Sequence, residues 1–309
     1  LFIYYDMLLL GKRIRYISKT STAVPIINKT NFSKEKINLP PLQEQKAIAD
    51  TLSAIDDKIE LNNKINQNLE AQAQAIFKSW FIDFEPFQDG EFVESELGMI
   101  PKGWEVVNLN HLAGRKNGYS YRSKDMNEES NNKLITLKNF NRDGSYNNKE
   151  FRRIDITDRM KTHHYLKEND ILVACTDLTQ KAEVIGNPIL YHSTNEFEKA
   201  IFSMDLVKIV PKNPEIYLYI YYILKDYRFK EFAKNYSTGT TVLHLNKKCF
   251  DDYRLAIGPK KIINSFQKLV EPIFNHKKIL IKQNQKLSQL RDTLLPKLIS
   301  GEIRIPLDK

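Results

Sequence analysis

Two long stretches of the sequence carry apolar residues alternately every four and every three positions, the spacing of a helix that packs along a coiled-coil seam. One stretch follows Pro41 and the other follows Pro259. The seam positions of the first are Ile48, Leu52, Ile55, Ile59, Asn62, Asn66, Leu69, Ala73, Ile76 and Trp80. Those of the second are Phe266, Val270, Ile273, Lys277, Leu280, Asn284, Leu287, Arg291, Leu294 and Leu298. Such a helix needs a partner that buries its stripe, and we expect the two helices to be each other's partners.

Both stretches belong to an internal repeat. A shift of 218 residues aligns the sequence with itself without a gap, and six of the thirteen positions in 20–32 are identical to those in 238–250. The same shift aligns Lys64, Asn66, Gln67 and Leu69 with Lys282, Asn284, Gln285 and Leu287. One offset that serves a turn, a proline and a helix indicates duplicated domains. Because the second globular domain opens near Gly98, we expect about 120 residues of the first domain upstream of Leu1, with residues 1–38 as its tail.

Asn66 and Asn284 occupy equivalent positions inside the two seams. A buried polar pair costs stability but selects one register and orientation, so we expect these two residues to set the register. The alternative is that both face solvent, because a straight helix drifts against a strict heptad. Pro272 interrupts the second stripe and predicts either a kink or a later start of that helix.

Between the helices, residues 98–258 change to short apolar runs that turn residues separate. Four of these runs predict strands: Leu134–Leu137, Asp170–Ala174, Glu183–Ile185 and Met204–Val210. Asp143-Gly144 lies at the centre of a predicted turn. Residues 214–232 have helical spacing instead. The predicted fold class is therefore α+β, a globular domain plus two long coiled-coil helices.

Charge narrows the class of partner. The chain has 47 Lys and Arg against 38 Asp and Glu, a formal net charge of +9. This excess suits a polyanion, nucleic acid before an anionic membrane surface. No apolar run in the sequence approaches the ~20 residues that span a bilayer. The two cysteines, Cys175 and Cys249, form no CxxC pair, which fits a reducing compartment such as the cytoplasm and argues against a disulfide framework or a zinc site.

Three segments of the globular domain combine basic, aromatic and small hydroxyl residues, as DNA-binding loops do. The first, residues 115–124, offers Lys116, Tyr119, Tyr121, Arg122 and Lys124. The second, residues 176–181, offers Thr176, Gln180 and Lys181, and the third offers Thr238, Thr240, Thr241 and the nearby His244. Basic side chains and hydroxyls suit phosphates, arginine can also pair with guanine, and glutamine pairs with adenine. Each loop alone is equally explained as a solvated turn, so the functional interpretation depends on their occurrence in one basic domain.

Catalytic motifs are absent from the sequence. It has no glycine-rich nucleotide or S-adenosylmethionine loop, and Asn38-Leu39-Pro40-Pro41 lacks the adjacent Asn-Pro of adenine methyltransferases. Glu44-Gln45-Lys46 has the form of a nuclease ExK motif but lies in the first turn of the predicted helix, where the helix dipole favours an acid. His163-His164 lacks metal-ligand spacing, so a structural or DNA-facing role is expected. We therefore expect no catalytic residue and no metal site.

Several motifs, weak alone but ordered, resemble the specificity subunits of type I restriction–modification systems. Leu39-Pro40-Pro41-Leu42-Gln43-Glu44-Gln45 leads into the first helix, and Gly98-Met99-Ile100-Pro101-Lys102-Gly103-Trp104 opens the second domain. Residues 118–125 resemble the first loop of a target recognition domain, residues 166–172 its Leu-x-x-Gly-Asp-Ile-Leu strand, and residues 291–302 the usual C-terminal end. Two features depart from the family pattern: Asn169 replaces the glycine, and the second copy has Gly258-Pro259-Lys260 where the first has the fuller proline motif.

The resemblance implies a remnant of the first target recognition domain at 1–38, a central coiled-coil helix at 39–85, a linker at 86–97, a second target recognition domain at 98–258 and a C-terminal coiled-coil helix at 259–309. Each recognition domain would read one half of a bipartite DNA site, and the antiparallel helices would set the distance between the halves. Methylation subunits with S-adenosylmethionine and restriction subunits with ATP and Mg²⁺ would dock on this scaffold, and the chain itself would bind no cofactor. Three alternatives stay open: a coiled-coil scaffold whose globular domain binds protein, a fused enzyme with upstream catalytic domains, and self-pairing of the chain to replace the missing domain.

Overall fold

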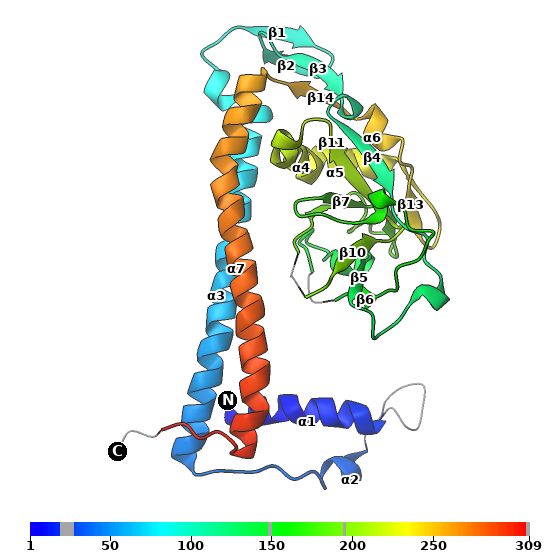
Figure 1. Cartoon of the computed structure of the whole chain (residues 1–309). Coiled ribbons are helices and arrows are strands. Elements are labelled where there is room, and N and C mark those ends of the chain that lie inside the picture. Colours follow the sequence, from blue (N-terminus) through cyan, green and yellow to red (C-terminus); the bar gives the residue numbers. More distant parts are fainter. Residues whose placement is uncertain (19–27, 148–149, 194–195, 307–309) are drawn as a thin grey trace. The chain divides into compact units, whose positions relative to one another are not determined.

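The computed structural model describes residues 1–18, 28–147, 150–193 and 196–306. It combines helices with small sheets, which confirms the predicted α+β class (Figure 1). The chain divides into two compact units: unit 1 comprises residues 1–69 and 276–309, and unit 2 comprises residues 70–275. The two long helices, α3 (Leu42–Phe81) and α7 (Lys260–Ser300), contribute to both units.

The starts of α3 and α7 follow the sequence repeat, because Leu42 and Lys260 are 218 residues apart. Each helix directly follows a proline, a residue that suits a helix start because it has no amide hydrogen to leave unpaired. Of the two outcomes predicted at Pro272, a kink or a later helix start, the later start does not occur, since α7 continues through this proline. Val270 and Phe274 on either side of this proline are buried in the core of unit 2, so packing holds a turn that the proline alone would weaken.

The strands of unit 2 form small sheets. The largest has the order β4 (Ala113–Asn117), β11 (Leu206–Pro211), β7 (Ile171–Ala174) and β9 (Pro188–Leu190), and its neighbours are antiparallel. A second contains β10 (Lys199–Phe202), β5 (Asn132–Ile135) and β6 (Arg152–Arg153), with β10 and β5 parallel. A third contains β12 (Ser237–Thr238), β13 (Leu243–Leu245) and β8 (Thr176–Asp177). Two further antiparallel pairs are β1 (Phe92–Ser95) with β2 (Gly98–Pro101), and β3 (Glu105–Asn108) with β14 (Arg254–Ile257).

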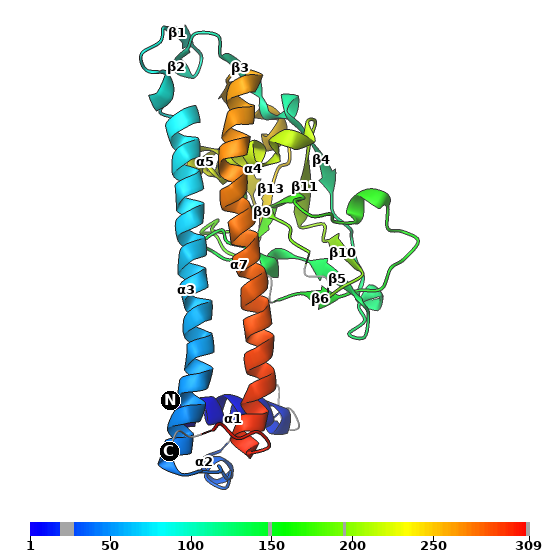
Figure 2. The same cartoon turned by 60° about the vertical axis from the view of Figure 1, so that its left-hand side comes forward.

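Three helices complete unit 2: α4 (Tyr217–Lys225), α5 (Tyr227–Asn235) and α6 (Cys249–Asp252). Residues 218–224 of α4 are all buried, because α4 is covered by α3 and α7 on one side and contacts β9 of the sheet on another (Figure 2). Its Tyr219 ring packs on Phe77 and Phe266 with centroid distances of 6.0 and 6.3 Å. The helical spacing predicted for residues 214–232 is confirmed, with a break at Asp226, whose carboxylate accepts the Arg228 amide at 3.0 Å and caps α5.

Three of the four predicted strands are present within a few residues of their expected bounds, as β5, β7 and β11. The predicted strand at Glu183–Ile185 is wrong, because these residues lie in a turn before β9. The amides of Val184 and Ile185 donate to the Asp177 carboxylate, at 2.7 and 3.3 Å, and so are not used in a sheet. Residues 86–97, expected as a linker, contain β1.

Unit 1 also contains α1 (Phe2–Ser18) and α2 (Lys29–Phe32); residues 20–27 of the repeated segment lie outside the described residues. Its core is formed by Phe2, Tyr5, Ile48, Ala49, Leu52, Leu295, Leu298 and Ile299. Polar contacts surround this core: the Asp56 carboxylate accepts from the Tyr5 hydroxyl at 2.8 Å and from Arg291 at 2.7 Å. Glu44 of the ExK sequence is buried and pairs with Arg304 at 2.6 Å, which is a structural role.

The polar contact between α3 and α7 in unit 1 differs from the predicted pair. Asn284 is hydrogen-bonded across the helices, but to Asn62 and Asn63: Asn62 Nδ2 donates to Asn284 Oδ1 at 2.8 Å, and Asn284 Nδ2 donates to Asn63 Oδ1 at 2.8 Å. The helices run antiparallel, so two residues at equivalent positions of the repeat lie at different heights along the pair and do not face each other. Applying the 218-residue offset to both members of the Asn62–Asn284 contact gives the equivalent contact, in which Asn66 lies opposite Leu280. Asn66 Oδ1 is accordingly buried without a hydrogen-bond partner.

Candidate nucleic-acid interface

The second and third predicted loops lie side by side in the sheet β12-β13-β8. His244 on β13 is opposite Thr176 on β8 and Thr238 on β12. Gln180 Nε2 also donates to the carbonyl oxygen of Thr240 at 2.7 Å. Two segments about 60 residues apart in the sequence therefore form one surface.

The first predicted loop joins this surface through the turn between β10 and β11, residues 203–205. The Tyr119 amide donates to the Phe202 carbonyl at 2.8 Å, and the Met204 amide donates to the Tyr119 carbonyl at 3.0 Å. On the other side of the turn, the Thr176 hydroxyl donates to the Asp205 carboxylate at 3.3 Å. The turn thus lies between the first and second loops. We call the three loops and this turn the reading surface.

A close backbone contact fixes the first loop against the turn. An ideal Cβ built on Gly118 would lie 2.0 Å from the Ser203 carbonyl oxygen, so only glycine fits there. Lys247 adds a second connection, because its Nζ donates to Asn117 Oδ1 at the end of β4 at 2.9 Å. Figure 1 shows β4, β7 and β13 close together in unit 2.

Most of the predicted DNA-binding residues are accessible on this surface. The exposed ones are Lys116, Arg122, Lys124, Gln180, Lys181, Thr238, Thr240, Thr241 and His244, and Tyr121 is half-buried. Two predictions are wrong. Tyr119 is only 3% exposed and its hydroxyl is bonded to Asp125 at 3.1 Å and Thr157 at 3.0 Å, and Thr176 is 6% exposed. Both side chains support the loops from below and are not available to DNA.

Two buried carboxylates hold the backbone of the loops. Asp125 accepts the Arg122 amide at 2.8 Å and Arg159 at 2.5 Å, and Asp177 accepts the amides of Thr179 and Val184 at 2.9 and 2.7 Å. Burial works against the charged form of both, but these hydrogen bonds outweigh it and keep the pKa of each carboxyl below its usual value. The loops are therefore held by ionised, internally satisfied groups.

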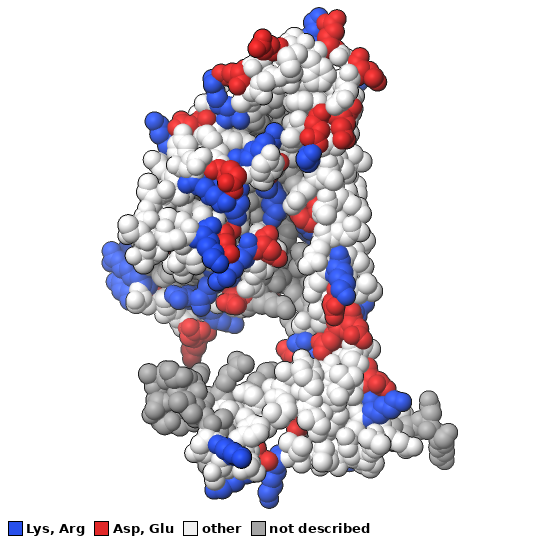
Figure 3. Space-filling view, turned by 180° about the vertical axis from the view of Figure 1, so that it is seen from behind, with Lys and Arg blue, Asp and Glu red and all other residues white. Residues whose placement is uncertain are grey.

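The free charge on the reading surface is mainly positive. Lys116, Arg122, Lys124 and Lys181 are exposed, and Lys and Arg side chains gather over the lower part of the globular unit on the face in Figure 3. Burial, followed by the charges of Lys116, Lys161 and Lys208, lowers the pKa of His163, so this ring is neutral near pH 7. His164 is 9% exposed and its Nδ1 accepts the Lys161 amide at 3.0 Å, a structural role.

Sequence reasoning missed two apolar side chains on this surface. Met204 is 54% exposed in the turn between β10 and β11, and Leu178 is 72% exposed in the second loop. Nothing in the hydrophobic pattern separates them from core residues, because Met204 begins a predicted strand and Leu178 follows a buried one. The spacing of apolar residues along the sequence does not reveal a turn that packs against segments distant in the sequence.

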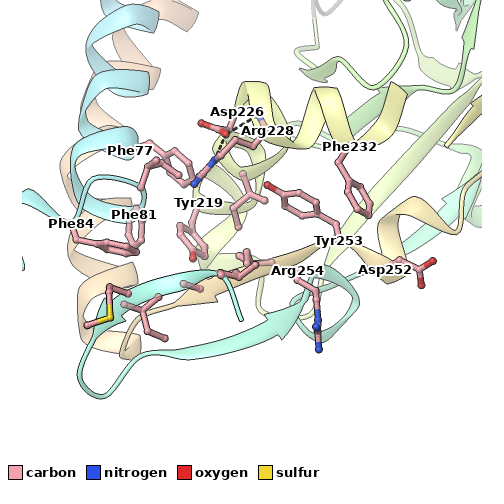
Figure 4. Close-up of a pocket in the computed structure, with 17 residues that line it drawn as sticks. Phe77, Phe81, Phe84, Tyr219, Asp226, Arg228, Phe232, Asp252, Tyr253 and Arg254 are labelled. Atoms are coloured by element: carbon pink, nitrogen blue, oxygen red, sulfur yellow. Dashed lines mark hydrogen bonds and ion pairs between the residues drawn. The ribbon is translucent and has the colours of Figure 1, made fainter. Parts of the chain in front are cut away.

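A pocket of about 580 Å³ lies elsewhere in unit 2, between the end of α3, α4, α5 and the strands β2 and β14 (Figure 4). Aromatic and aliphatic side chains form most of its wall. At its edge Arg228 pairs with Asp226 at 2.7 Å, and Asp252 accepts the Tyr236 hydroxyl at 3.0 Å. These charged groups are engaged in structural pairs, and we assign no chemistry to the pocket.

Two further searches were confined to the described ranges. Within residues 1–18, 28–147, 150–193 and 196–306, no three His, Cys, Asp or Glu side chains are grouped so that they could hold a metal ion. None of the helices described over those ranges has the length and hydropathy that crossing a membrane requires.

Comparison with known proteins places the chain in a family. The family model described as type I restriction modification DNA specificity domain matches residues 1–71 and 101–290. The chain is 30% identical over 301 residues to the type I restriction enzyme MjaIX specificity subunit of Methanocaldococcus jannaschii, covering 96% of the chain and 67% of that protein. It is 26% identical over 343 residues to the HindI specificity subunit of Haemophilus influenzae, covering 92% and 72%. The solved structure of a type I restriction-modification S subunit from M. genitalium has a similar fold, with a TM-score of 0.55, 18% identity, and coverage of 96% of this chain and 72% of that one.

Proposed function

We propose that this chain, which belongs to the family of type I restriction modification DNA specificity domains and is a specificity subunit, reads one half of a bipartite DNA site with the reading surface of unit 2. The observation that carries the proposal is that three loops separated in the sequence form one surface. The first and second loops contact the turn at residues 203–205, and the third is joined to the second by the pairing of β13 with β8 and by the Gln180–Thr240 hydrogen bond. Rigid loops that expose cations and amides suit recognition of a duplex, because phosphate contacts position the protein and side chains at base edges select the sequence.

Individual residues of the reading surface have different roles in this proposal. Lys116, Lys124 and Lys181 neutralise phosphates, which gives affinity without sequence preference. Arg122 is suited to the paired acceptors of guanine. Gln180 uses its Nε2 to hold Thr240, so it also fixes the distance between the second and third loops.

The long helices have a second role, as a spacer and docking scaffold. At ~1.5 Å per residue, the 40 residues of α3 extend over about 60 Å. The Asn62–Asn284 hydrogen bond favours one register of α3 against α7, and the register sets the separation of the two half-sites. Methylation and restriction subunits dock on this scaffold and contribute S-adenosylmethionine, ATP and Mg²⁺, while this chain provides sequence recognition and no catalytic residue.

The test is DNA binding by the complex of this chain with methylation subunits, measured at several salt concentrations. Lys116→Ala should weaken binding to cognate and unrelated duplexes equally and reduce the slope of log affinity against log salt by about 1. Arg122→Ala should weaken cognate binding by roughly 1–3 kcal/mol and leave unrelated duplexes nearly unaffected. Lys102→Ala, directly after strand β2 and exposed, is the control and should behave as the unsubstituted chain.

Two results would overturn the proposal. Cognate affinity and salt slope that stay unchanged in both variants would remove the reading surface from DNA recognition. Weak binding without salt dependence in the unsubstituted complex would favour the alternative of a protein-binding scaffold, because phosphate contacts always release counterions.

A further inference from the structure

We infer that Met204 and Leu178 are specificity residues that contact the methyl groups of thymine, an inference that rests on the proposed function of the reading surface. They are large apolar side chains, 54% and 72% exposed, on a surface whose other exposed side chains are cations, amides, hydroxyls and the imidazole of His244. Single exposed apolar residues are common on proteins. These two differ from exposed apolar residues elsewhere in unit 2 because they lie on the reading surface, each in a turn whose backbone is held by internal bonds.

Met204 is held in place from both sides. Its amide donates to Tyr119 of the first loop at 3.0 Å, and the Leu206 amide closes the turn by donating to the Ser203 carbonyl at 3.0 Å. The following residue, Asp205, uses its carbonyl to accept the Cys175 amide at 2.8 Å. These bonds fix the backbone of the turn, and with it the position from which the Met204 side chain extends into solvent.

Leu178 is displayed in a comparable way. The preceding residue, Asp177, is 3% exposed and accepts the amide and hydroxyl of Thr179 at 2.9 and 3.0 Å. These bonds fix the backbone on both sides of Leu178 while its side chain makes no part of a buried cluster. The loop thus keeps a leucine in water, at a cost that a contact in the complex with DNA would offset.

The chemistry of the duplex identifies what such side chains contact. In the major groove the base edges present hydrogen-bond donors and acceptors, and the thymine methyl is the apolar feature that distinguishes one base pair from another. Cations and amides on the reading surface would bind the polar base edges, and Met204 and Leu178 would contact the thymine methyl. Insertion between base steps is the other use of an exposed apolar residue, and it is characteristic of minor-groove binders that bend DNA.

The experiment replaces thymine by uracil, one position at a time, in a duplex that carries the cognate site. Uracil keeps the pairing and the hydrogen-bonding edge and lacks only the methyl. In the complex with methylation subunits, we expect about fourfold weaker binding at one or two positions, the effect of one buried methyl. Met204→Ala should abolish the difference between thymine and uracil at one of these positions, and Leu178→Ala at another.

Matched controls are available in the same unit. Met99 and Leu97 are 57% and 47% exposed near the tip of the hairpin β1–β2, outside the reading surface. Met99→Ala and Leu97→Ala should keep the uracil pattern of the unsubstituted chain. Thermal unfolding of all four variants should be unchanged, because the side chains are exposed, and this measurement separates loss of contact from loss of fold.

The results distinguish this inference from the function on which it rests. If the unsubstituted complex prefers its cognate site but no uracil position weakens binding, the inference is wrong and the proposed function stands. The inference is equally wrong if the weakened positions respond to uracil identically in Met204→Ala, Leu178→Ala and the controls. If the complex shows no sequence preference, the proposed function itself fails.

Discussion

Leucine placed at two repeat-equivalent asparagines, Asn66 and Asn284, should change the stability of unit 1 in opposite directions. Asn284 Oδ1 accepts Asn62 Nδ2 at 2.8 Å, and Asn62 is completely buried. Asn66 has a buried Oδ1 without a partner, and by the repeat it lies opposite Leu280, which is 5% exposed. The same substitution therefore breaks a buried hydrogen bond at one position and removes an unpaired carbonyl at the other.

The magnitudes follow from these contacts. Asn284→Leu leaves the Asn62 amide with Gln283 Oε1 at 3.5 Å as its remaining acceptor, so it should lower the free energy of unfolding by about 1–3 kcal/mol. Asn66→Leu removes a desolvated acceptor and adds an apolar contact with Leu280, so it should raise that free energy by about 1 kcal/mol. Combining Asn62→Leu with Asn284→Leu should recover most of the loss, because no buried amide is then left unpaired.

Native-state hydrogen exchange of peptides from residues 55–66 and 280–291, in increasing urea, reports on unit 1 separately from unit 2. The reasoning is refuted if Asn66→Leu destabilises these peptides, or if Asn284→Leu and Asn66→Leu have effects of the same sign. A double variant no more stable than Asn284→Leu alone would show that the loss does not arise from the unpaired Asn62 amide.

Two further predictions concern unit 2. Gly118→Ala should lower the free energy of unfolding by about 1–3 kcal/mol and weaken cognate DNA binding, because its Cβ would meet the Ser203 carbonyl oxygen at 2.0 Å. The control is Gly114→Ala in the preceding strand β4, where a Cβ has nothing within 4 Å, and equal urea midpoints for the two variants would contradict the prediction. Burial lowers the pKa of Lys133 to about 8 from its ordinary 10.5, so the unfolded chain binds more protons than the folded chain between these values. The free energy of unfolding should therefore rise by about 1–2 kcal/mol from pH 7.5 to 9.5, and a Lys133→Met variant that keeps the full rise would assign it to other groups.

The sequence predicted the elements whose signal is local and periodic. The seam spacing and the repeat predicted both long helices, and β5, β7 and β11 followed from apolar runs. The strand expected at Glu183–Ile185 failed because a side chain seven residues away, Asp177, takes the Val184 amide. The predicted Asn66–Asn284 pair is wrong for a different reason. The sequence offset identifies residues at equivalent positions of the two helices, but in an antiparallel pair residues at equivalent positions are not in contact.

Asn169 shows how a departure from the family pattern can be physically neutral. Its φ is 68°, in the left-handed region. Glycine adopts this conformation without strain, and asparagine is among the residues with a side chain that adopt it most often. The turn into β7 therefore keeps its shape without the expected glycine. A sequence shows such a replacement as a mismatch, and the backbone conformation is needed to interpret it.

For the candidate site, composition pointed to the three loops, and the structure was needed to bring them together. The contacts that do so involve buried or backbone groups: the Ser203 carbonyl against Gly118, the Asp205 carboxylate on Thr176, and the Asp177 carboxylate on the second loop. Tyr119 is of a residue type common in DNA-binding loops, but its hydroxyl bonds to Asp125 and supports the loop from inside. Residue type alone does not separate a side chain that faces the partner from one that holds the loop.

This division between support and display has a consequence for specificity. The acids that hold the loops, Asp125 and Asp177, are 4% and 3% exposed, while Arg122, Gln180 and Met204 extend into solvent from the backbone that the acids hold. Because the hydrogen bonds that hold the loop backbone are made by the buried acids, substitution of the exposed side chains should change the stability of the fold little. Gln180 is the exception, since its bond to Thr240 ties two loops together, so its replacement should alter the spacing of the loops. Under the proposed function, the reading surface would therefore change the DNA sequence it recognises by substitution at its other exposed positions, with the same loop backbone.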